Sequence, residues 1–149
     1  MTKRVLVLLD PARNERLLPW LRRVLGGPPG DVYLLSVRPP LEGVMAGQHR
    51  VAYAHQAEEA ARAATLVHLS PAASRLADEG FRVATDVRFG DPAGTTLRTA
   101  DEVGASLIVL AVSAGRGWRR WWSRGADHEI LRRARVPVLA VRRHGQRAA

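Results

Sequence analysis

The chain has 149 residues and no cysteine, which excludes disulfide bonds, thiolate metal sites and thiol catalysis. Its length predicts one domain over residues 1–149, with residues 143–149 as a flexible polar tail. The net charge is +9, and ten arginines stand against two acidic residues from Arg116 to Ala149, so the basic character lies in the last quarter of the chain. Such an excess either attracts polyanions or covers solvated faces, and we favour the second interpretation.

The first quarter of the chain predicts two buried strands joined by a helix. Lys3–Asp10 is apolar from Val5 to Leu9, which is typical of a central strand with both faces covered. A leucine-rich segment with helical spacing follows and stops at Gly26-Gly27, with Pro19 either in its first turn or at a kink. Val32–Val37 then reads as the second strand.

The middle of the chain predicts a long helix, a less buried strand and a third helix. Val51–Glu79 is alanine-rich and helical, and Ser70-Pro71 resembles an N-cap followed by a first-turn proline, so the segment is one helix, a kinked helix or two. Phe81–Phe89 alternates only in part, as a strand with one less buried face does. Gly90-Asp91-Pro92 lacks the lysine and spacing of a phosphate loop and predicts a capped helix start, and Gly104 ends that helix.

The last third predicts a strand, a glycine-bearing loop, a short helix and a final strand. Ala105–Val112 and Val136–Val141 are continuous apolar runs, and Pro137 stands near the start of the second. Glu129–Ala134 has helical spacing between them. The amide groups at the start of such a helix favour an anion, phosphate above all.

Strands and helices therefore alternate along the whole chain. Crossovers of this length predict an α/β fold with one doubly wound, parallel, five-stranded sheet and helices on both faces, similar to a Rossmann fold. Ligands bind such folds beyond the carboxyl ends of the strands, where the strand order reverses. Asp10, Val37 and the loop after Val112 are the segments that reach this edge.

Five sequence blocks resemble the universal stress protein family over nearly the whole length. The blocks are VLVLLD ending at Asp10, VYLLSV, RFGDPAGTTL, GASLIVLAV and ILRRARVPVLAV. The resemblance implies a fold like that of the adenine nucleotide alpha hydrolases and a role as a stress-response accessory protein with unknown protein partners. It also implies a homodimer in which the final strand, Val136–Arg142, pairs with its copy.

Members of this family that bind ATP resemble one another in a loop pattern of G-x-x-G, nine residues, then G-[S/T]. Without gaps, the four positions of this pattern fall on Ala111, Ala114, Arg124 and Gly125. With the frame moved by one residue, they fall on Val112, Gly115, Gly125 and Ala126. Neither frame supplies the hydroxyl residue, and the moved frame needs a one-residue deletion before Ile130.

The loop therefore predicts an impaired nucleotide site, because glycine lets amide groups approach phosphates closely and the hydroxyl donates a further bond. Asp10 is retained, and by resemblance it faces the adenosine moiety of ATP. The alternative is an ATP-binding signalling module in which Arg116 or Arg124 clamps the phosphates. The candidate cofactor-binding residues are Asp10, Val37, Ala111, Ala114, Gly115, Arg124, Gly125 and Ala126.

Gly115–Gly125 interleaves tryptophan with arginine, a composition that single-stranded nucleic acid binding uses. The simpler interpretation, which we favour, is that the tryptophans fill a loop cover or a dimer contact. By resemblance, members of the family have leucines at these positions. The histidines show no metal spacing and no serine stands in a nucleophile elbow, so we expect neither a metal site nor an enzyme. No apolar run approaches the roughly 20 residues of a membrane span, and the N-terminal run is too short for a signal peptide, so we expect a cytoplasmic protein.

Overall fold

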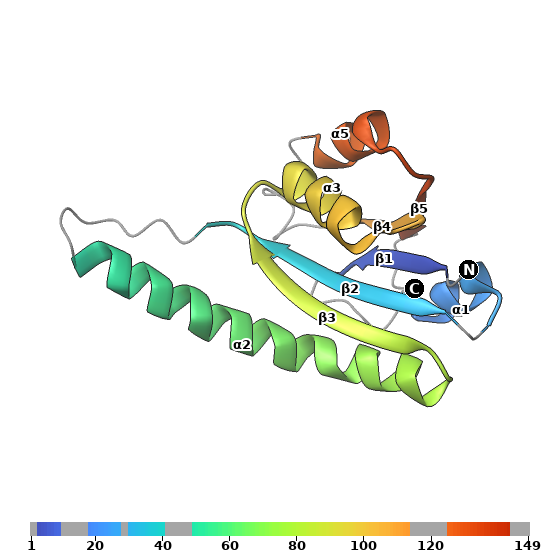
Figure 1. The fold of residues 1–149 in the computed structure, drawn as a ribbon, viewed down its shortest axis with the longest axis horizontal. Helices are drawn as coiled ribbons and strands as arrows, with labels where there is room; N and C mark the ends of the chain where they lie inside the picture. Colours follow the sequence, from blue (N-terminus) through green and yellow to red (C-terminus); the bar gives the residue numbers. More distant parts are fainter. Residues whose placement is uncertain (1–2, 10–17, 28–29, 41–48, 114–124, 144–149) are drawn as a thin grey trace, which may run out of the picture.

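A computed structural model describes residues 3–9, 18–27, 30–40, 49–113 and 125–143, and Figure 1 shows their arrangement. The strands are β1 (Arg4–Leu8), β2 (Asp31–Arg38), β3 (Arg82–Phe89), β4 (Leu107–Ser113) and β5 (Val138–Arg143). The helices are α1 (Leu18–Leu25), α2 (His49–Asp78), α3 (Pro92–Val103) and α5 (Ala126–Arg133). The predicted tail covers residues 143–149, but Arg143 belongs to β5, and residues 144–149 lie outside the described residues.

The strands form one parallel sheet in the order β3-β2-β1-β4-β5. β1 lies at its centre, with Val7 aligned to Leu34 of β2 and to Val109 of β4. The side chains of Leu6 and Val7 are fully buried on opposite faces of the sheet, in agreement with the prediction of a central strand. The doubly wound α/β fold predicted from the sequence is confirmed.

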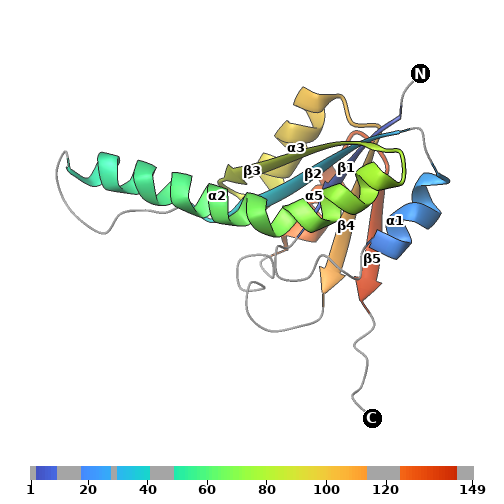
Figure 2. The same cartoon turned by 90° about the horizontal axis from the view of Figure 1, so that it is seen from below.

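Helices cover both faces of the sheet (Figure 2). On one face, Leu21 of α1 and Leu69 and Leu76 of α2 pack against the odd-numbered side chains of β1. On the other face, Ala100 of α3 and Ile130 of α5 pack against the even-numbered ones. Two apolar layers therefore enclose the central strands, which is why β1 reads as a continuous apolar run.

Helix α2 is one helix of 30 residues, and Pro71 lies inside it. The alternative of two helices divided at Ser70-Pro71 is therefore wrong. Proline removes only its own bond to the carbonyl of Val67, a highly exposed residue, while buried Leu69 and Leu76 hold the helix on the sheet. The amino-terminal part of α2 extends well beyond the sheet in both views (Figures 1 and 2).

Helix α3 begins and ends as predicted. The carboxylate of Asp91 accepts a hydrogen bond from the amide of Gly94 at 2.8 Å, and Pro92 occupies the first turn. Gly104 ends the helix in the left-handed conformation. Three threonines of this helix, Thr95, Thr96 and Thr99, are buried. The hydroxyls of Thr96 and Thr99 donate to backbone carbonyls one turn back.

Two predicted boundaries near the carboxyl end of the chain differ in the structure. Helix α5 starts at Ala126 rather than near Glu129, because the amide of Glu129 already donates a helical hydrogen bond to the carbonyl of Gly125. The final strand runs from Val138 to Arg143 instead of starting at Val136. The carbonyl of Pro137 still accepts a bond from the amide of Ile108.

Candidate functional site

The reversal of strand order lies between β1 and β4, the central pair of the sheet. Leu8 at the carboxyl end of β1 is aligned with Leu110, and the amide of Leu9 extends the pairing by donating to the carbonyl of Leu35. Strand β1 ends at Leu8, and β4 ends at Ser113. The segments following both central strands therefore start from one edge of the sheet, as the sequence predicted.

Much of the predicted site lies outside the residues that the structure describes. This holds for Asp10, Ala114, Gly115 and Arg124, and for the arginine and tryptophan segment up to Arg124. Their roles stay predictions. The backbone of Ala111 is described in β4, aligned with Val141 of β5.

The side chain of Val37 is fully buried against the α3 layer, close to buried Ala93. Its side chain is therefore not available to a ligand in solution. A cofactor contact at Val37 stays a prediction, and with the side chain buried it is restricted to the backbone.

The start of α5 is the part of the predicted phosphate loop that the structure describes. Gly125 is the N-cap residue with φ +82° and ψ 19°, and no side chain caps the helix. The amide groups of a first helical turn have no partner within the helix, and they attract anions. Ala126, the next residue, is buried against the core of the α3 layer.

Two carboxylates stand in the same first turn. Asp127 is half-buried, and Glu129 forms an ion pair with Arg133 at 3.1 Å. Negative side chains at a helix start satisfy the helix dipole themselves and repel a bound anion. The positive end of α5 is therefore partly neutralised by its own sequence.

A second polar cluster ties β2, β3 and α3 together and was not foreseen from the sequence. The hydroxyl of Tyr33 donates to Asp86 at 2.6 Å, and Arg88 donates to Asp86 at 2.8 Å and to Glu102 at 2.7 Å. Burial, followed by the hydrogen bond to Asp86, raises the pKa of the Tyr33 hydroxyl above 10.0. The hydrogen bond with Asp86 is also the main cause that raises the pKa of Arg88. Every member of this cluster has a partner, which is typical of a structural network.

Within the described ranges, no group of three histidine and acidic side chains is arranged to hold a metal ion. None of the helices in that part of the chain is both long and apolar enough to span a bilayer.

Comparison with known proteins gives a match over almost the full length. The sequence profile of the universal stress protein family (Usp) matches residues 1–142. No curated protein sequence gives a significant match.

Several solved structures share the fold. The universal stress protein UspA from Lactobacillus plantarum is 16% identical, with a TM-score of 0.69 over 94% of this chain and 97% of that one. A universal stress protein in complex with cAMP is 18% identical, with a TM-score of 0.63 over 95% and 97% of the two chains. The universal stress protein from Archaeoglobus fulgidus in complex with dAMP is 21% identical, with a TM-score of 0.56 over 93% and 96%.

Proposed function

The chain belongs to the universal stress protein family, and on that premise we propose that it is a homodimeric stress-response accessory protein with an impaired nucleotide site. In this proposal it catalyses no reaction of its own and acts in the cytoplasm through contacts with other proteins. The start of α5 is the observation that carries the impairment.

Gly125 has the positive φ that glycine adopts readily, which favours the frame in which it fills the last glycine position of the ATP-binding pattern. In that frame Ala126 occupies the position at which the ATP-binding pattern has a serine or threonine. A phosphate over α5 would therefore lack a hydroxyl donor and would be repelled by the negative charge of Asp127 in the first turn, whereas the carboxylate of Glu129 is paired with Arg133. Each change weakens the binding of a polyphosphate.

The test is to restore the missing features. We expect calorimetry to give weak ATP binding for the wild type. The double variant Ala126→Ser, Asp127→Asn should bind ATP at least about tenfold more tightly, because one donor is added and one negative charge is removed. Asp78→Asn, an equal charge change at an exposed position of α2, is the control and should not alter the affinity. Tight ATP binding by the wild type would contradict the proposal.

Adenine nucleotide binding is the second candidate function. It is favoured by the uncapped amide groups at Gly125 and by the two neighbours solved with cAMP and dAMP. Both of those ligands carry a single phosphate, which needs fewer donors than the triphosphate of ATP. AMP is therefore the second ligand to titrate. The hypothesis of nucleic acid binding stays a prediction, because most of its arginine and tryptophan segment lies outside the described residues.

The proposed dimer is supported by the two edges of the sheet, which differ. The β3 edge is protected, since Arg62 of α2 donates to the backbone carbonyl of Val87 and lies 5.6 Å from the ring centre of Phe89. The β5 edge ends the sheet with an apolar strand. An apolar edge strand tends to pair with another chain, and a second copy supplies an identical strand.

A further inference from the structure

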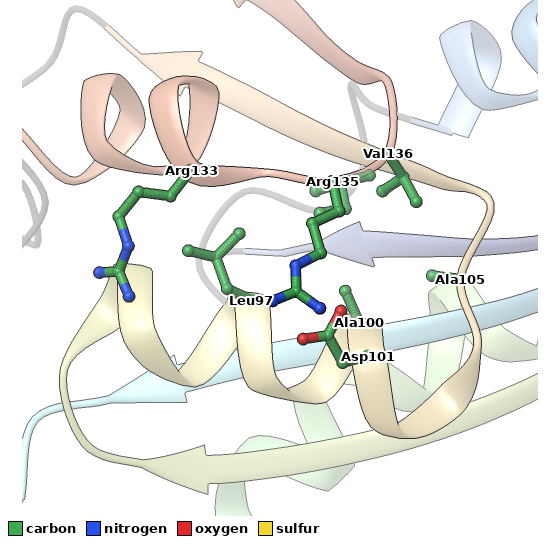
Figure 3. Close-up of a pocket in the computed structure, with 8 residues that line it drawn as sticks. Leu97, Ala100, Asp101, Ala105, Arg133, Arg135 and Val136 are labelled. Carbon is green, nitrogen blue, oxygen red and sulfur yellow. The ribbon is translucent and has the colours of Figure 1, made fainter.

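A pocket of about 270 Å³ lies between α3 and α5, at the amino ends of β4 and β5 (Figure 3). It is therefore at the opposite edge of the sheet from the candidate functional site. Its apolar lining consists of Leu97, Ala100, Ala105, Ile108 and Val136. Ile108 and Ala105 are buried and belong to the core, so this part of the wall is rigid.

Three charged side chains complete the lining, and they differ in their bonding. Arg133 forms an ion pair with Glu129, one turn earlier in α5. Among the described residues, the side chains of Asp101 and Arg135 make no ion pair or hydrogen bond, with each other or with a third residue. Figure 3 shows the carboxylate of Asp101 and the guanidinium of Arg135 both directed toward the pocket.

The dipoles of helices α3 and α5 also contribute to the electrostatic potential in this pocket. Helix α3 ends at Val103 and α5 ends at Arg133, so both helices run toward this edge of the sheet. The carboxyl end of a helix carries a partial negative charge and favours a cation. Asp101 in the last turn of α3 increases the attraction for a cation on its side of the pocket. Arg135, which follows α5, offers a planar pair of donors that matches a carboxylate.

We propose that this pocket binds a free apolar α-amino acid. Its carboxylate pairs with Arg135, its ammonium group with Asp101, and its side chain lies on Leu97, Ile108 and Val136. A ligand with both charges uses both unpaired groups, whereas a simple carboxylate or a simple amine leaves one of them without a partner. The volume accommodates a side chain of the size of leucine, and it is below the range of drug-sized ligand pockets.

The test is a methyl-detected NMR titration of the full chain with L-leucine at millimolar concentration. We expect shift changes at the methyl groups of Leu97, Ile108 and Val136, and none at the exposed Val67 of α2. Glycine should bind more weakly because it has no apolar side chain. The two single-charge analogues, 4-methylpentanoate and 3-methylbutylamine, should each bind at least about tenfold more weakly than L-leucine.

Two variants test which pocket residue binds each charged group of the ligand, and a third variant is the control for the loss of a charge. Arg135→Gln should weaken the binding of L-leucine and 4-methylpentanoate, whereas Asp101→Asn should weaken the binding of L-leucine and 3-methylbutylamine. Arg132→Gln removes an exposed arginine of α5 that does not line the pocket, and it should bind L-leucine like the wild type. All three positions are exposed, so the variants should fold.

Three results would overturn the proposal. The first is the absence of shift changes at the pocket methyl groups with L-leucine. The second is equal L-leucine affinity for Arg135→Gln and Arg132→Gln. The third is binding of 4-methylpentanoate as tight as that of L-leucine, because the ammonium group would then have no role.

Discussion

Gly125 and Gly90 both have positive φ angles, but a side chain would be unfavourable at each position for a different reason. A Cβ added at Gly125, with φ +82°, meets nothing within 4 Å, whereas one added at Gly90 meets the hydroxyl oxygen of Thr95 at 2.8 Å. Gly125→Ala should therefore lower the free energy of unfolding by about 1 kcal/mol, the cost of a left-handed conformation alone.

Gly90→Ala is the matched comparison and should cost more, since the buried Thr95 has to move as well. Urea denaturation of the two variants measures the difference. Equal losses for both variants would contradict the close contact with Thr95 at Gly90. No loss for Gly125→Ala would show that the turn before α5 is not held in this conformation.

Tyr33 gives a stability difference that depends on pH. Tyr33→Phe removes the hydrogen bond to Asp86 and should lower the free energy of unfolding by about 1–2 kcal/mol at neutral pH. Because burial raises the pKa of Tyr33 above 10.0 in the folded state, its contribution is complete below pH 10 and is lost as the pH rises through the folded-state pKa.

The stability gap between wild type and Tyr33→Phe should therefore shrink above pH 10. Denaturation curves of both proteins on either side of that pH measure it. A gap that stays constant or widens at high pH would contradict the hydrogen bond to Asp86.

At the scale of elements, the sequence predicts best the strands that are buried on both faces. β1 and β4 are continuous apolar runs because helices cover them on either side, and their positions follow from that pattern. The continuity of α2 through Pro71 could not be predicted, because local signals at Ser70-Pro71 match a helix start equally well. The packing of Leu69 and Leu76 on the sheet favours one continuous helix over two helices, and this packing is a tertiary effect.

The length of α2 also exceeds what its own crossover needs. A helix of 30 residues is about 45 Å long, whereas a strand of 8 residues such as β3 spans about 26 Å. The helix therefore overhangs the sheet, as both ribbon views show (Figures 1 and 2). Sequence periodicity gives the length of such a helix and says nothing about how much of it is covered.

Strand β5 allows a direct test of the proposed dimer. The amide of Ile108 donates to the carbonyl of Pro137, and in a parallel pair alternate residues bond to the neighbour, so the amide of Ala140 points to the open edge. Ala140→Pro should keep the pairing with β4 and prevent pairing with a second copy.

Size-exclusion chromatography with light scattering should give a dimer for the wild type and a monomer for Ala140→Pro. Ala140→Val retains the amide and is the control, expected to remain dimeric. A folded Ala140→Pro variant that is still fully dimeric would exclude β5 as the interface, and a monomeric wild type would contradict the dimer itself.

At the scale of the whole molecule, the parallel topology places the carboxyl ends of β1, β2 and β4 at one edge of the sheet, and alternation of strands and helices was enough to predict this. The contact between Tyr33 and Asp86 could not be predicted, because the two residues are 53 positions apart and no local pattern connects them. The chemistry of the candidate site could not be predicted from the sequence pattern alone either. The roles of Asp10 and of the loop after β4 came from the family resemblance.

The two ends of the sheet have different proposed roles. In our proposal the carboxyl edge carries an impaired nucleotide site at the start of α5, which includes Ala126, Asp127 and Glu129. The amino edge carries the pocket between α3 and α5, whose lining includes Asp101 and Arg135. Because the two sites lie at opposite ends of α5, a variant at one edge should leave ligand binding at the other unchanged.

The adenine nucleotide content of the purified protein tests the proposed impairment most directly. The protein is purified without added nucleotide and denatured, and the released adenine nucleotides are quantified by chromatography and mass spectrometry. We expect far less than one nucleotide per protomer, because the start of α5 lacks the hydroxyl donor and carries two carboxylates. Close to one ATP per protomer would contradict an impaired site.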